Sequence, residues 1–220
     1  MSDVVTRNVA MLHTDSTTDD PMRLTVLALA LLLASPALAT QEYILPTLFD
    51  VTDVAADDVL NIRAEPSASA AIIGQFVPDQ TGIEVIEERD GWGRVNSGEG
   101  SGWVSMRYLS YRTDVWQAGM LPASFACAGT EPFWGLSVQQ SRAILGGPDM
   151  DETPRRISAV LGGDIFRDPS RAILAEGLTA SVVPQICSDG MSDRLFGLRA
   201  SVILHGDQPR LLQGCCSVQP

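Results

Sequence analysis

Lysine does not occur in this sequence of 220 residues, so all 15 basic residues are arginine. They are outnumbered by 27 acidic residues, which gives a formal net charge of -12. Nucleic acids and anionic lipid surfaces both favour proteins with clustered positive charge. The charge balance therefore argues against either one as the main partner, and we expect no nucleic-acid binding.

Histidine is nearly absent as well, with one in each half of the chain, His13 and His205. A serine hydrolase would need His205 together with Ser188 or Ser192, but no G-x-S-x-G segment presents the nucleophile. The C-x-x-C and paired-histidine spacings of a structural zinc site are also missing. We therefore predict no metal, no cofactor and no catalytic residue.

Long apolar runs are scarce, and the clearest one spans the ten residues from Leu24 to Leu33. It lies in MRLTVLALALLLASPALA, residues 22–39, which has one arginine, an apolar core and a small-residue ending. This is the layout of a secretory signal peptide cleaved after Ala39, with Met22 as the true start. The alternative is an uncleaved membrane anchor, but a spanning helix needs about 20 apolar residues, more than this run provides. We expect residues 1–39 to be leader and the mature chain to be periplasmic or secreted, with no stable membrane insertion.

The few cysteines all lie beyond residue 126, at Cys127, Cys187, Cys215 and Cys216. An even number in an exported protein favours disulfides. The adjacent Cys215 and Cys216 are only about 3.8 Å apart at Cα, below the usual disulfide range, and their side chains point to opposite faces of a strand. We predict that Cys127 and Cys187 each bond one member of this pair, with both assignments open.

The segment from Leu48 to Tyr111 has no cysteine, and this asymmetry indicates two domains. Short apolar runs broken by turn-forming residues predict an all-β fold. The pair Asp90-Gly91 is typical of a two-residue hairpin turn. We expect a first domain at residues 48–111, a linker at 112–121 and a cysteine-containing β domain at 122–220.

Residues 60–109, LNIRAEPSASAAIIGQFVPDQTGIEVIEERDGWGRVNSGEGSGWVSMRYL, resemble the bacterial SH3 domain, SH3b. The resemblance rests on a strand ending N-x-R, a Pro-Ser turn, an I-I-G strand, then D-G-W, G-W-V and a closing Tyr-Leu. It implies a small SH3-like barrel in an exported or surface-exposed protein. It further implies binding of peptidoglycan or peptide, without catalysis.

The second domain opens with FACAGTEPFWGLSV, residues 125–138, and ends with the block from Cys187 to Cys216. These blocks resemble an uncharacterised family of exported bacterial proteins with the patterns C-x-G-x-E-P-F-W, C-x-D-x-M-S-D and G-C-C. Alternating apolar residues at 198–204 predict a second small, disulfide-stabilised β-barrel or sandwich. Residues 142–179, between the two blocks, do not contribute to this resemblance.

Trp92 and Trp103 are expected on neighbouring strands, with Tyr108 and Arg63 nearby in the SH3b pattern. These four are the candidate ligand-binding residues, since aromatic rings supply contact area while an indole N–H or a guanidinium supplies direction. The alternative is that both tryptophans are core residues of a domain too small to leave large rings exposed.

Together these features predict an exported cell-envelope binding protein, not an enzyme, whose SH3b domain binds peptidoglycan or an envelope peptide. The alternative is a secreted interaction or inhibitor protein whose cysteine-containing domain contacts a protein. A third hypothesis is an envelope hydrolase using Glu131, Asp189 or Asp193, because paired carboxylates cleave glycosidic bonds. Against it, aspartates in such segments commonly serve as turn and capping residues.

Overall fold

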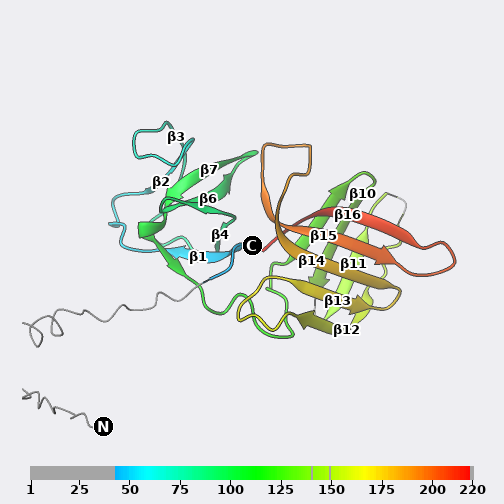
Figure 1. Cartoon of the computed structure of the whole chain (residues 1–220). Coiled ribbons are helices and arrows are strands. Elements are labelled where there is room, and N and C mark those ends of the chain that lie inside the picture. Colours follow the sequence, from blue (N-terminus) through cyan, green and yellow to red (C-terminus); the bar gives the residue numbers. More distant parts are fainter. Residues whose placement is uncertain (1–42, 140, 149, 219–220) are drawn as a thin grey trace, which may run out of the picture. The chain divides into compact units, whose positions relative to one another are not determined.

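The computed structural model of the chain describes residues 43–139, 141–148 and 150–218. The expected leader, residues 1–39, lies outside this range. The described residues form strands and turns almost throughout, apart from one short 3-10 helix (Figure 1). None of them belongs to a helix long and apolar enough to span a membrane. The all-β prediction is confirmed.

The first part of the chain folds into two small sheets with the strand orders β4-β1-β8 and β3-β2-β7-β6-β5. Their shared core includes Phe49, Ile62, Val85, Val95 and Val104, all nearly inaccessible to solvent. This is the predicted SH3-like barrel. Its elements are β1 (Thr47–Val51), β2 (Leu60–Arg63), β3 (Ile72–Phe76), β4 (Ile83–Val85), β5 (Glu88–Arg89), β6 (Trp92–Ser97), β7 (Gly100–Ser105), η1 (Met106–Tyr108) and β8 (Leu109–Tyr111).

The turn between β5 and β6 has the backbone that its sequence predicts. Asp90 and Gly91 have φ angles of 51° and 76°, as a primed two-residue hairpin turn requires. The turn sets the register of the β5–β6 hairpin, in which Arg89 lies opposite Trp92. Trp92 is therefore the first residue of the returning strand, as expected.

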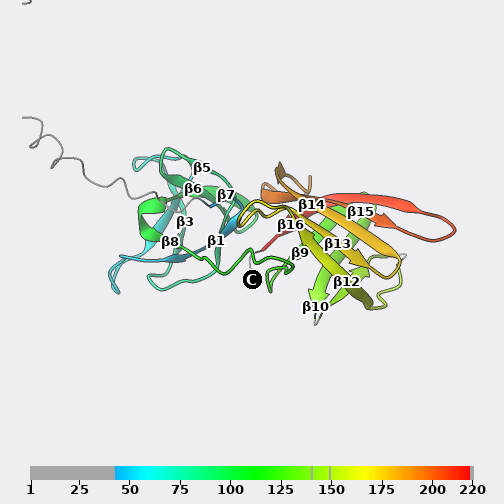
Figure 2. The same ribbon diagram turned by 60° about the horizontal axis from the view of Figure 1, so that its bottom comes forward.

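In the second part, eight described strands close into a barrel with the order β10-β11-β12-β13-β14-β15-β16-β9 (Figure 2). Alternate residues such as Leu178, Ala180 and Val182 point into its core, as period-2 patterning requires. Of the predicted barrel or sandwich, the barrel forms. Its strands are β9 (Ala126–Thr130), β10 (Phe133–Gln139), β11 (Arg142–Gly146), β12 (Arg155–Gly162), β13 (Arg171–Ala175), β14 (Leu178–Cys187), β15 (Phe196–Leu204) and β16 (Arg210–Ser217).

The segment expected to be a linker, residues 112–121, contributes to the barrel core. Val115 and Trp116 are buried there together with Leu48 from β1. The Trp116 indole N–H donates to the Pro46 carbonyl at 2.8 Å, and the Arg171 guanidinium lies 5.1 Å from the centre of the Trp116 ring. The SH3-like barrel and the eight-stranded barrel are thus joined by a packed segment with its own buried side chains.

Two disulfides link the barrel strands, Cys127–Cys216 and Cys187–Cys215. Cys127 and Cys216 lie opposite each other on β9 and β16 and belong to the barrel core. Cys215, the residue before Cys216 on β16, points to the other face and bonds Cys187 at the end of β14. The structure therefore matches the expected scheme, in which each member of the adjacent pair has a different partner.

Candidate functional site

A groove on the SH3-like barrel brings together three of the four predicted ligand-binding residues. Its volume is about 520 Å³. β2 supplies Arg63, β6 supplies Trp92 and η1 supplies Tyr108. We call it the SH3 groove, and its lining includes Asp53, Asp58, Asn61, Arg63, Trp92 and Tyr108.

Arg63 is held at the wall of the SH3 groove by the turn that follows β2. Its Nη1 donates to the Ala70 carbonyl at 2.8 Å, and the side chain is half-buried. A guanidinium has five N–H donors in a fixed plane, so this one bond orients the group without using all of its donors. Arg63 is therefore suited to donate hydrogen bonds to an anionic group of a ligand, such as a carboxylate.

Trp92 and Tyr108 supply the aromatic surface of the SH3 groove. Both residues are half-buried, and both line the groove. The Arg107 guanidinium lies 5.7 Å from the centre of the Tyr108 ring. Rings held in this way offer a large apolar contact area at little entropic cost on binding.

Trp103 does not line the SH3 groove. It lies on the same face of the β6–β7 pair as Trp92, because Arg94 is opposite Trp103 and Trp92 is opposite Ser105. However, the guanidinium groups of Arg89 and Arg94 lie 4.9 and 5.5 Å from the centre of its ring, and only 5% of the residue is exposed. The expected tryptophan pair is thus divided into one accessible ring and one covered ring.

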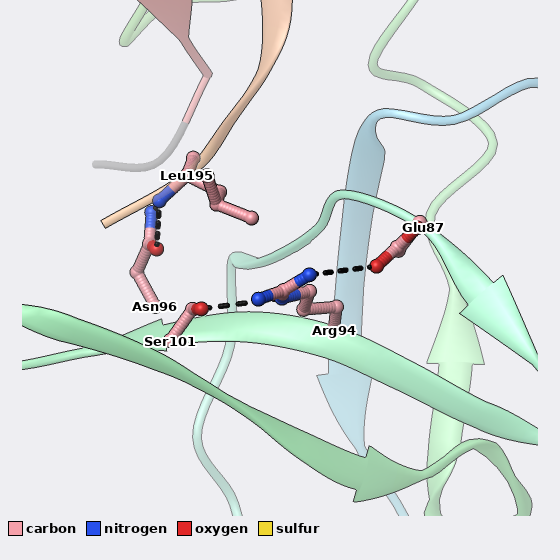
Figure 3. A network of polar contacts seen from close by, with 5 residues as sticks. All are labelled: Glu87, Arg94, Asn96, Ser101 and Leu195. Carbon is pink, nitrogen blue, oxygen red and sulfur yellow. Dashed lines mark hydrogen bonds and ion pairs between the residues drawn. The ribbon is translucent and has the colours of Figure 1, made fainter. Parts of the chain in front are cut away.

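Arg94, which covers Trp103, is itself fixed by two neighbours. Its Nη1 lies 3.0 Å from a carboxylate oxygen of Glu87, and its Nε donates to the Ser101 hydroxyl at 3.2 Å (Figure 3). The partners come from the β4–β5 connection and from β7. This network keeps the guanidinium over the indole and explains why Trp103 is covered.

Three further groove residues, Asn61, Asp53 and Asp58, were not among the predicted ligand-binding residues. Asn61 is two positions before Arg63 on β2, so the alternation that places Arg63 on this face also places Asn61 there. The two aspartates lie between β1 and β2, and no local pattern marked them. Together with the Arg63 cation, their carboxylates give the lining of the SH3 groove both signs of charge.

The carboxylates considered for hydrolysis are divided between separate cavities. Glu131 and Asp189 line a cavity of about 250 Å³ beside the Cys187–Cys215 disulfide, whereas Asp193 lines another one. Hydrogen bonds from the backbone N–H groups of Met191 and Ser192 lower the pKa of Asp189. A general acid in glycoside hydrolysis needs the opposite shift. Asp189 has the contacts of a turn-forming residue.

His205 is exposed at the end of β15, and its Nε2 lies 3.1 Å from the Thr179 hydroxyl. In the part of the chain that the structure describes, no group of three histidine, cysteine, aspartate or glutamate side chains is arranged to hold a metal ion.

Residues 58–110 match the family model of the bacterial SH3 domain. The match covers Asp58, Asn61, Arg63, Trp92 and Tyr108 of the SH3 groove, and the resemblance of this segment is confirmed. The search of curated proteins found no match, and neither did the search of solved structures. The resemblance proposed for the eight-stranded barrel has no support from these comparisons.

Proposed function

We propose that this chain is an exported protein that binds peptidoglycan through the stem peptide, which enters the SH3 groove. A bacterial SH3 domain indicates a role in cell-wall binding in general, and residues 58–110 match the family model of such a domain. The observation that supports the peptide ligand is the lining of the groove. Arg63, two aspartates and two half-exposed rings all face one cavity of about 520 Å³.

The chemistry of a stem peptide fits this lining. Such a peptide has carboxylates, amino groups and methyl side chains within a few residues of one another. The Arg63 guanidinium would donate hydrogen bonds to a carboxylate, Asp53 or Asp58 would pair with an amino group, and the rings of Trp92 and Tyr108 would cover the methyl groups. Recognition by both signs of charge would favour a short zwitterionic peptide over a plain glycan chain.

A pull-down with purified sacculi tests the proposal on the full chain. We expect Trp92→Ala and Tyr108→Ala each to weaken binding about 5-fold or more, as truncation of a central aromatic at an interface does. Phe166→Ala is the matched control, because this residue is 73% exposed and lies in the loop between β12 and β13, not in the SH3 groove. Unchanged binding by both groove variants, or an equal loss in the control, would contradict it.

The proposal includes binding without turnover. In the cavity that Glu131 and Asp189 line, backbone hydrogen bonds lower the pKa of Asp189, whereas a general acid in glycoside hydrolysis needs a raised one. Sacculi incubated with the wild-type chain should therefore release no soluble fragments above the level seen without protein. Release that depends on Glu131 or Asp189 would support the hydrolase hypothesis instead.

Export is also part of the proposal. Its support is the signal-peptide pattern at residues 22–39 together with two disulfides, which persist in oxidising compartments. N-terminal sequencing of exported material should find Thr40 or a close neighbour as the first residue. An intact leader in the membrane fraction would support the anchor alternative.

A further inference from the structure

The two sequence blocks of the eight-stranded barrel meet at a groove that the proposed function does not use. The Thr130 hydroxyl, from the first block, donates to the Asp189 carbonyl of the second at 3.1 Å. Beside this contact lies a groove of about 660 Å³. We call it the barrel groove, and its lining includes Phe133, Gly135, Gly146, Glu152, Asp189 and Met191.

We propose that the barrel groove docks a segment of a partner polypeptide that has an arginine or lysine next to an apolar side chain. This goes beyond the binding of peptidoglycan, because no residue of the SH3 groove takes part. Three features of the groove support it: an open floor, exposed apolar walls, and charged side chains that are all acidic.

The floor of the barrel groove is the outer face of β9, β10 and β11. Gly135 of β10 lies opposite Ala128 on one side and Gly146 on the other. A Cβ atom added at Gly135 would meet no atom within 4 Å, so the space above this point of the floor is open. A ligand side chain can therefore reach the strand backbone, which larger outward residues would cover.

The walls present Phe133 and Met191, which are 54% and 68% exposed. Grouped apolar exposure of this kind marks interaction sites in soluble proteins, and a methionine adapts its shape to different partners. Met191 is held in place by its neighbours: its N–H donates to Asp189 at 3.0 Å, and the Asp193 N–H donates to the Glu99 carbonyl at 3.0 Å. An ordered wall reduces the entropy lost on binding.

The charged side chains among the described lining residues are Glu152 and Asp189, both acidic. The Glu152 carboxylate lies over the floor, since a Cβ at Gly146 would be 2.5 Å from its Oε1. The whole chain is acidic too, with a net charge of -12. Electrostatic complementarity therefore selects a cationic segment, and it disfavours a second copy of this acidic chain.

Fluorescence anisotropy with two labelled decapeptides tests the proposal on the full chain. One probe alternates arginine and leucine, and the other alternates glutamate and leucine. We expect the cationic probe to bind and the acidic probe to bind at least about 10-fold more weakly, because charge complementarity favours the first and like-charge repulsion opposes the second.

Variants of the groove residues then locate the site. We expect binding of the cationic probe to be weakened about 5-fold or more by each of three variants: Phe133→Ala, Met191→Ala, and Gly135→Val, which fills the floor. Glu152→Gln should also weaken binding of this probe. The matched controls are Phe166→Ala for an exposed ring and Glu176→Gln for an exposed carboxylate. Sacculus binding should be unchanged in the groove variants, which separates this test from that of the SH3 groove.

Several results would overturn the proposal. They include equal losses in groove and control variants, equal binding of both probes, or amide shifts in the wild-type NMR spectrum at Trp92 but not at Gly135 when the cationic probe is added. A dimer in sedimentation that Phe133→Ala dissolves would assign the groove to self-association instead. Because NMR uses the wild-type chain, a variant that fails to fold does not remove the test.

Discussion

Asn96 and Leu195 exchange two hydrogen bonds although they are 99 positions apart in the sequence (Figure 3). The Asn96 Nδ2 donates to the Leu195 carbonyl at 2.8 Å, and the Leu195 N–H donates to the Asn96 Oδ1 at 3.1 Å. The amide thus pairs with the backbone just before β15 as a neighbouring strand would. It connects β6 of the SH3-like barrel to the eight-stranded barrel.

Replacing Asn96 by alanine should therefore destabilise the protein. Both Leu195 backbone groups lose their partner in a part-buried position, at a cost of about 1–3 kcal/mol in the free energy of unfolding. Guanidinium denaturation followed by tryptophan fluorescence measures this. Gln75→Ala on β3, where the side chain is exposed, is the control and should change stability by less than about 0.5 kcal/mol. Equal stability of the two variants would contradict the prediction.

The two tryptophans of the SH3-like barrel should differ in their effect on stability. Trp103 is 5% exposed, so Trp103→Ala should cost about 3–5 kcal/mol, as truncation of a buried aromatic does. Trp92 is half-buried, and Trp92→Ala should cost clearly less while it reduces sacculus binding. Thermal unfolding of both variants provides the comparison. A Trp92→Ala variant as unstable as Trp103→Ala would mean that Trp92 is a structural residue.

Features of the SH3-like barrel that depend on residues close together in the sequence were predictable. The Asp90-Gly91 turn follows from the φ angles that these residues tolerate, and the strands follow from alternation. The covering of Trp103 was not predictable. It depends on where the Arg89 and Arg94 guanidinium groups lie after folding, and alternation alone puts Trp92 and Trp103 on one face.

The role of residues 112–121 was missed for a related reason. A glycine and the absence of regularly spaced apolar residues are typical of a linker. However, Val115 and Trp116 pack with Leu48 from β1. That contact joins positions more than sixty residues apart, which no local pattern reveals. The presence of one of only four tryptophans in the segment was the available indication.

Gly129 makes room for the Trp134 indole inside the eight-stranded barrel. A Cβ at Gly129 would lie 2.1 Å from the Trp134 Nε1, which donates to the Gln213 carbonyl at 3.2 Å. Gly129→Ala should therefore displace the ring and cost about 1–3 kcal/mol or more through overpacking. Gly135→Ala on the next strand is the control, since its Cβ meets nothing within 4 Å. Denaturant midpoints that fall equally in both would contradict this prediction.

Asp189 should make the stability of the barrel depend on pH in the acidic range. Its pKa is lowered in the folded state, chiefly by the Met191 N–H, so its stabilisation is present above the unfolded-state pKa of about 3.9 and is lost as the pH falls through the folded pKa. Asp189→Asn should cost at most about 1 kcal/mol at pH 7, because the group is largely solvated. The difference from wild type should shrink below about pH 4. A constant difference down to pH 2 would contradict this.

The two disulfides should differ in how much they stabilise the barrel. Cys127–Cys216 joins residues 89 apart and Cys187–Cys215 joins residues 28 apart. In the chain-entropy model the longer loop is worth about 4–5 kcal/mol and the shorter one about 3–4 kcal/mol. The first bridge also lies in the barrel core, where its removal leaves a cavity, whereas Cys215 points to the outer face.

Double alanine variants of each bridge measure this difference. Replacing Cys127 and Cys216 should lower the free energy of unfolding more than replacing Cys187 and Cys215, under oxidising conditions. Peptide mapping without reduction provides the control. Cys215 and Cys216 stay in one fragment, so the wild type should yield a single species in which the Cys127 peptide and the Cys187 peptide are both linked to that fragment. A bridge between Cys127 and Cys187 would contradict the connectivity. The reverse order of stabilities would show that closure of the longer loop is not the dominant contribution.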